Sequence, residues 1–205
     1  MNFRILSQLS AALAAVALAG ATAAAAPITF THQGTAAAGA VGGVAFGSTA
    51  FTITAFGDTD NREAYDVVPG AEGFFIDHGS ARIELASVGE FLFTTATRTF
   101  NTRSITTAGF SRAGAIGTDL VNGPTLPALA TWDMLSSIGP LSGSGQILQW
   151  DSSPVHTSGG QLLLEGGASP IVFTATVVPE PTALALAAAL GAIGAAGGRR
   201  GRGPR

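Results

Sequence analysis

Apolar and polar residues alternate in short windows throughout residues 27–177, and this alternation restricts the fold more than any other feature of the chain. The clearest window is 171–177, where Ile171, Phe173 and Val177 fall on one side and two threonines fall on the other. A period of two residues is typical of a half-buried strand. Eleven of the twelve Phe residues lie in the same region, together with abundant Thr and scattered Gly. The region therefore predicts a β fold.

Other windows show the same alternation and place pairs of apolar residues on one face: Phe51 with Ile53, Ile83 with Leu85, and Phe91 with Phe93. Groups of Gly, Pro, Asn and Asp separate these windows. We expect strands at 28–33, 45–56, 74–77, 80–87, 90–99, 104–111, 145–150, 160–165 and 171–178. Eight or nine short strands with frequent turns favour a single antiparallel β-sandwich of jelly-roll type.

The segment 126–138 is ambiguous at this level. Leu129, Trp132 and Leu135 recur at three-residue spacing. This spacing also fits a short helix that crosses the end of the sandwich.

The first 26 residues have the organisation of an export signal. Arg4 supplies a positive start, 9–18 is an apolar stretch, and 21–26 is rich in alanine. This order is typical of a signal peptide that a signal peptidase removes. Cleavage directly before Pro27 is unfavourable, so we expect it after Ala23 or Ala25. The predicted body is then 27–177, which is enough chain for one domain with a sizeable core.

The last 28 residues form a second localisation segment. Val178-Pro179-Glu180-Pro181 is expected to be extended, because proline fixes φ and restricts the residue before it. The stretch 182–198 contains no charge, and as a helix it would span about 26 Å, at the short end for a bilayer. A basic tail follows, with Arg199, Arg200, Arg202 and Arg205. The alternative is a buried or amphipathic helix with a disordered tail, but 182–198 has no polar face.

This segment closely resembles the PEP-CTERM sorting domain of exported bacterial proteins. The resemblance rests on the Val178–Pro181 motif, the apolar 182–198 stretch and the arginine tail, in that order at the end of the chain. It implies recognition by an exosortase in the inner membrane, cleavage near Pro-Glu-Pro, and transfer or release of the body. It also implies a source that makes exopolysaccharide. Proteins with this domain have very different bodies, so it assigns no catalytic residue here.

The two ends agree on the side of the membrane. An export signal starts in the cytoplasm, and arginines beside a spanning segment favour the cytoplasm, so the body between them is expected outside. Five Arg stand against twelve acidic residues in the body, a formal net charge of −7. Such a surface argues against nucleic acid and anionic membranes as partners. The chain has no Cys, so no disulfide stabilises the body.

Familiar catalytic and nucleotide-binding motifs are absent from the sequence, and the three His residues are far apart. We expect no cofactor, and a bound metal ion is the one exception to consider. Oxygen-bearing side chains are concentrated in one short loop: Asp58, Asp60, Asn61, Glu63 and Asp66. Calcium binds six to eight oxygens, so this loop is a candidate Ca²⁺ site. The alternative is a solvated turn in which Asp and Asn bond to the nearby backbone.

Three aromatic residues are candidates for stacking on a sugar ring: Tyr65, Trp132 and Trp150. A place in the core is the alternative for both tryptophans. A glycoside hydrolase would need two facing carboxylates, and Asp133, between Trp132 and Met134, has the most apolar setting among the acids.

These features predict a non-enzymatic exported protein. It would be anchored transiently in the inner membrane, sorted by an exosortase, and used as a structural or binding component of the exopolysaccharide or biofilm layer at the cell surface. A carbohydrate-binding module or lectin is one alternative, and a secreted polysaccharide hydrolase is another.

Overall fold

A computed structural model of the chain describes residues 26–66, 72–114 and 118–178. Within these residues the regular elements are strands and three short 3₁₀ turns, and the paired strands run antiparallel. The prediction of a mostly β, antiparallel body is confirmed. The predicted signal segment and the predicted spanning segment 182–198 lie outside the described residues.

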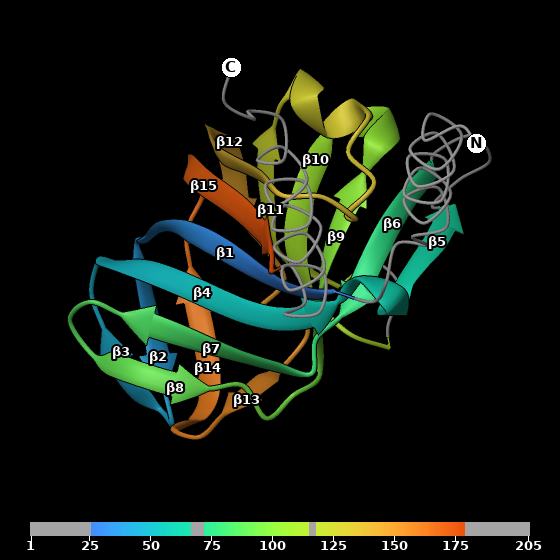
Figure 1. Cartoon of the computed structure of the whole chain (residues 1–205). Coiled ribbons are helices and arrows are strands. Elements are labelled where there is room, and N and C mark those ends of the chain that lie inside the picture. Colours follow the sequence, from blue (N-terminus) through green and yellow to red (C-terminus); the bar gives the residue numbers. More distant parts are fainter. Residues whose placement is uncertain (1–25, 67–71, 115–117, 179–205) are drawn as a thin grey trace, which may run out of the picture.

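In the part of the chain that the structure describes, fifteen strands make up two sheets (Figure 1). Their bounds are β1 Pro27–Ala36, β2 Ala38–Val41, β3 Val44–Phe46, β4 Thr49–Asp58, β5 Arg62–Asp66, β6 Glu72–Asp77, β7 Ser80–Leu85, β8 Gly89–Leu92, β9 Thr97–Thr102, β10 Thr107–Arg112, β11 Asp119–Thr125, β12 Ile138–Ile147, β13 Val155–Thr157, β14 Gly160–Glu165 and β15 Ala168–Val177. The large sheet has the order β5-β6-β9-β10-β11-β12-β15-β1-β4-β7-β8, and the small sheet has the order β13-β14-β2-β3.

The large sheet bends so that its two halves pack against each other. In Figure 1, β15, β1, β4, β7 and β8 run across the view, and the strands from β12 to β5 run steeply above and to the right of them. Ring contacts join the halves: Phe30 of β1 lies 5.8 Å from His78, and His32 lies 5.9 Å from Phe110 of β10. The result is a sandwich-like packing of one continuous sheet.

The small sheet continues three central strands of the large one around a corner. β1 leads into β2, β3 into β4, and β14 into β15, with small residues at the corners: Ala37, Gly47 and Ser48, Gly166 and Gly167. A bridge between Phe93 and Thr157 links the far edges of the two sheets. The predicted single strand at 45–56 is therefore wrong, because β3 and β4 belong to different sheets.

The alternation in the sequence describes the core well. Ile53, Ile83 and Phe173 have no exposed surface, and Phe51 and Leu85 are buried beside them. Phe91 and Phe93 pack against this core from one side, as their spacing predicts.

The ambiguous segment 126–138 contains one 3₁₀ turn, Pro127–Ala130, followed by irregular chain. Its backbone carbonyls accept hydrogen bonds from side chains instead of from a helix. Asn101 Nδ2 donates to the carbonyls of Leu129 and Trp132, at 3.0 and 2.7 Å. Arg103 Nε donates to the carbonyl of Ala130 at 2.8 Å. The segment does cross the end of the sandwich, but not as an α-helix.

Candidate functional site

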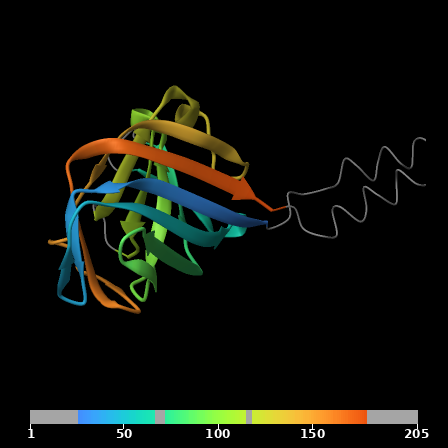
Figure 2. The same ribbon diagram turned by 90° about the vertical axis from the view of Figure 1, so that its left-hand side faces the viewer.

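The two ends of the described chain meet at one corner of the body. β1 and β15 are neighbours, with Ile28 opposite Val177, and the Val178 N–H donates to the Pro27 carbonyl at 2.8 Å. In addition, the Ala26 N–H donates to Thr59 Oγ1 at 2.9 Å. Figure 2 shows the blue start of β1 beside the orange end of β15. The chain therefore enters and leaves the body at the same point.

Of the predicted sorting motif, the structure describes only Val178, which is about half exposed. Pro179, Glu180 and Pro181 lie outside the described residues, and so do the four arginines of the tail. Among the described residues, no helix is long and apolar enough to cross a membrane.

The acidic loop lies at the same corner, and Asp58 in it bonds to the nearby backbone, as the solvated-turn alternative predicts. Its carboxylate accepts a hydrogen bond from the Asp60 N–H at 2.9 Å and caps the 3₁₀ turn Thr59–Asn61. Asp60 and Asn61 lie in that turn, whereas Glu63 and Asp66 lie in the edge strand β5. In the described part of the chain, no three His, Asp or Glu side chains are grouped so that they could hold a metal ion. The arrangement gives the Ca²⁺ hypothesis no support, and the hypothesis stays a prediction to be tested in solution.

Thermal unfolding provides that test. If the loop holds Ca²⁺ in the folded state only, saturating Ca²⁺ raises the unfolding midpoint above the value in a chelator, because a ligand specific to the folded state stabilises it. Asp58→Asn with Asp60→Asn should abolish this difference. Superimposable curves with Ca²⁺ and with EDTA exclude the site.

Both tryptophans belong to the core, so the interpretation of these residues as stacking platforms is wrong. Trp150 is 1% exposed and donates its indole N–H to the Leu120 carbonyl at 2.7 Å. Trp132 is 4% exposed, donates its indole N–H to the Ser136 carbonyl and packs at a steep angle against the Phe173 ring. Neither ring presents a face to a ligand. Tyr65 is different, because it is only partly buried and lies on the solvent side of β5.

We define the outer face as the side of β5, β6, β9, β10, β11 and β12 opposite the apolar core. Several of its residues, such as Phe100 and Thr107, are themselves covered by neighbouring side chains. Strand register assembles its side chains into rows that cross the strands. The first row consists of hydroxyl-bearing residues around one glycine, paired in the order Tyr65, Gly73, Thr102, Thr107, Thr125. Two hydrogen bonds run along it: Tyr65 Oη to Thr102 Oγ1 at 2.6 Å, and Thr107 Oγ1 to Thr125 Oγ1 at 2.7 Å.

The second row of the outer face changes from aromatic to amide character. It reads Phe75, Phe100, Gly109, Asn122, Gln146. Gly109 has no side chain, and the Phe100 ring occupies the space above it. This leaves Asn122 and Gln146 as the polar end of the row.

A third row carries the charges. Asp77 Oδ1 lies 3.0 Å from Arg98 Nε, and the Arg98 guanidinium lies 4.1 Å from the centre of the Phe75 ring. Ser111 and Asp119 continue the row on β10 and β11. Partial burial raises the pKa of the Asp119 carboxyl, and burial likewise raises the pKa of Tyr65.

A groove of about 370 Å³ lies where the first two rows reach β10, β11 and β12. Its wall residues are Ile105, Thr107, Asn122, Thr125, Ser144, Gly145 and Gln146. None of them is charged. The groove offers hydroxyl and amide groups that both donate and accept hydrogen bonds.

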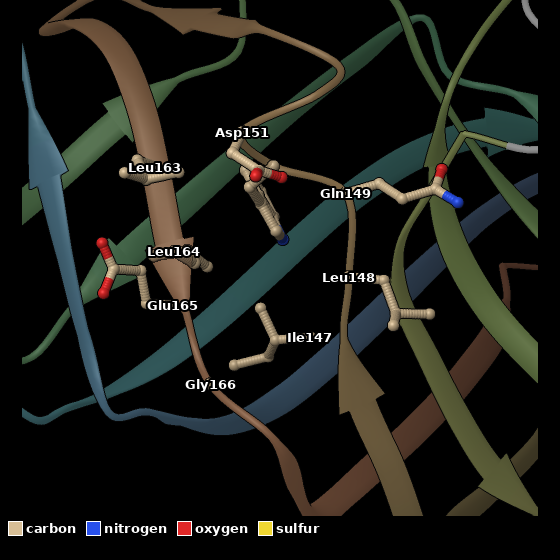
Figure 3. A pocket seen from close by; sticks show the side chains of 9 residues that line it. Ile147, Leu148, Gln149, Asp151, Leu163, Leu164, Glu165 and Gly166 are labelled. Carbon is tan, nitrogen blue, oxygen red and sulfur yellow. The ribbon is translucent and has the colours of Figure 1, made fainter.

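A second hollow, of about 310 Å³, lies between residues 147–151 and the end of β14 (Figure 3). Ile147 points toward β14, whereas Leu148 and Gln149 point away from it. Asp151 and Glu165 are the two acids of the lining, and both are exposed. Asp133 is not among them, because it lies in the loop after the 3₁₀ turn, where its carboxylate accepts the Leu135 N–H at 3.0 Å.

Two of the three histidines meet inside the sandwich, although 45 residues separate them in the chain. His78 Nε2 and His32 Nε2 lie 3.0 and 3.3 Å from the same Thr99 hydroxyl, and His78 Nδ1 lies 2.9 Å from Thr97 Oγ1. Burial lowers the pKa of each imidazole to about 3. His156 is exposed on β13. No pattern in the sequence indicates this pair.

Comparisons with protein families, with curated proteins and with solved structures find no match to this chain.

Proposed function

We propose that this chain is an exported protein whose body is held at the membrane by both ends and is then handed to an exosortase. The body serves as a non-catalytic structural or binding component of the exopolysaccharide layer at the cell surface. In this proposal 1–26 is the signal peptide, Pro179-Glu180-Pro181 is the processing motif, and 182–198 with the arginine tail is the temporary anchor. The body between them is a sandwich of jelly-roll type.

The observation that carries the proposal is the pairing of the first and last strands. Because Pro27 and Val178 are hydrogen-bonded neighbours, a signal segment and an anchor segment would reach the body at one corner. Both processing events would then occur beside each other, at the end that faces the membrane. Neither event would have to break a strand, since the segments adjoin β1 and β15 at their outer ends.

The body also has the composition that such a role requires. It has no Cys and depends on a continuous apolar core for stability. Its net negative charge would keep it off anionic headgroups after release.

Removal of 179–205 provides the test. The truncated protein should be released to the medium or periplasm without exosortase, because it has lost the anchor and the motif, while its circular dichroism and unfolding midpoint stay close to those of the full chain. Fractionation of cells with and without the exosortase measures the first point. Pro179→Ala with Pro181→Ala should instead leave the protein uncleaved in the inner membrane. A truncated protein that localises like the full chain contradicts the proposal.

A polysaccharide hydrolase is the competing function, and the hollow with Asp151 and Glu165 is the best place for it. Both side chains are exposed. A glycosidase normally holds its general acid in a less polar setting than its second carboxylate. The hollow therefore favours the non-catalytic proposal.

A further inference from the structure

We propose that the groove over β10, β11 and β12 on the outer face is a binding site for a neutral glycan chain. This inference rests on the proposed function, and it adds a place on the body and a chemical class of ligand to it.

The lining of the groove matches the chemistry of sugar hydroxyls. Asn122, Thr125, Ser144 and Gln146 bring amide and hydroxyl groups from two adjacent strands. Each of these groups can donate and accept hydrogen bonds, as each sugar hydroxyl can. At the rim, Ile105 is 57% exposed, which provides an apolar contact for the C–H face of a sugar ring.

One polar atom of the groove lacks a partner. Asn122 Oδ1 is buried and has no hydrogen-bond partner among the described residues. A buried acceptor without a partner is costly. A rotation of the Asn122 amide would bring this oxygen to the groove, where a donating sugar hydroxyl would satisfy it. The paired residue Gln146 is exposed and can reach the same ligand.

The charges of the groove and of the body favour a neutral glycan as the ligand. No residue of the groove is charged, and the body around it carries a formal net charge of −7. An acidic polysaccharide would be repelled at long range, and a cationic one would find no ion-pair partner inside the groove. A volume of about 370 Å³ lies at the lower end of the range for ligand sites and fits a short stretch of a chain.

The groove also lies far from the corner where the chain ends meet. Gln146 pairs with Ala168 at the start of β15, ten residues before Val178. At about 3.3 Å per residue this separates Gln146 from the corner by roughly 33 Å along the strand. A body held at that corner would keep the groove directed away from the membrane.

Side-chain amide resonances give a direct test. The full chain, in a detergent without a sugar headgroup, is titrated with hexasaccharides of β-1,4-glucose, α-1,4-glucose, β-1,4-xylose and β-1,4-mannose. We expect at least one of them to shift the side-chain NH₂ signals of Asn122 and Gln146 in a saturable way. The NH₂ signal of Gln161, an exposed residue on β14, should not move.

Matched variants complete the test. Gln146→Ala should weaken binding about three- to ten-fold, the expected loss of one or two hydrogen bonds. Gln161→Ala should leave the affinity unchanged. The inference is overturned if none of the four hexasaccharides shifts the two groove amides, or if both variants bind as the unmodified chain does. Such a failure leaves the result of the 179–205 truncation untouched, because localisation does not depend on Gln146.

Discussion

Acidification from pH 7 to pH 5 is expected to lower the free energy of unfolding of the body by between about 2 and about 4 kcal/mol. The cause is the buried pair His32 and His78. Each has a pKa lowered from 6.5 to about 3 in the folded chain. Between these two values the unfolded chain binds more protons than the folded chain, so stability is lost as the pH falls below 6.5. One fully buried histidine contributes about 2 kcal/mol over this range.

The surroundings explain why the folded chain resists protonation of these rings. His32 has no exposed surface, packs against Phe110 and Phe173, and its Nδ1 has no hydrogen-bond partner among the described residues. For His78, burial is the largest cause, and the charges of His32 and Arg98 act in the same direction. His78 keeps some exposed surface, so its contribution is the smaller of the two. The raised pKa of Asp119 acts in the opposite sense, since it favours the folded state in acid.

Urea unfolding at half-unit steps from pH 7.5 to pH 5 measures the effect. His32→Leu should remove at least half of the slope of unfolding free energy against pH, because the variant lacks the more deeply buried of the two imidazoles. His156→Gln is the matched control and should keep the slope of the unmodified chain. A slope that is the same with and without His32 would contradict this account.

Strands with one buried face could be predicted from sequence, and the others could not. The alternation at Phe51 and Ile53, or at Ile171 and Phe173, follows from burial of every second residue. β5 shows no such pattern because it is an edge strand with no fully buried residue. No strand was expected between 111 and 145, yet β11 runs through Asn122-Gly123-Pro124, with irregular register against β10. Glycine and proline mark bulges as well as turns.

The candidate site could be predicted only in part, for a physical reason. Tyr65 was recognised as an amphipathic aromatic residue. The row that contains it could not be, because Thr102, Thr107 and Thr125 become neighbours only through the register of separate strands. The two tryptophans were wrongly considered as surface residues. The sequence does not show whether an indole N–H donates to water or to a buried carbonyl. Trp150 binds the carbonyl of Leu120.

Gly109→Ala is expected to destabilise the body by about 3 kcal/mol, which lowers the unfolding midpoint by roughly 10 °C in a domain of this size. A methyl group at this position would clash with the Phe100 ring and would lie 2.6 Å from the carbonyl oxygen of Val121. The ring could turn away, but the carbonyl belongs to the paired strand β11 and cannot. The strain therefore falls on the backbone of β10 and β11.

Gly47→Ala is the matched control, because the new methyl group would meet no atom within 4 Å. It should unfold within about 2 °C of the unmodified chain, since a glycine-to-alanine change at an unstrained site has a small effect.

Adding Phe100→Ala to Gly109→Ala separates the two contacts. The second substitution removes the ring but not the Val121 carbonyl, and it also deletes a large buried side chain. The double variant should therefore remain at least as unstable as Gly109→Ala. Recovery to the midpoint of the unmodified chain would mean that the ring, and not the strand spacing, determines why this position is a glycine. Because Asn122 lies opposite Gly109, the single variant should also disturb the Asn122 side-chain amide signal before any glycan is added.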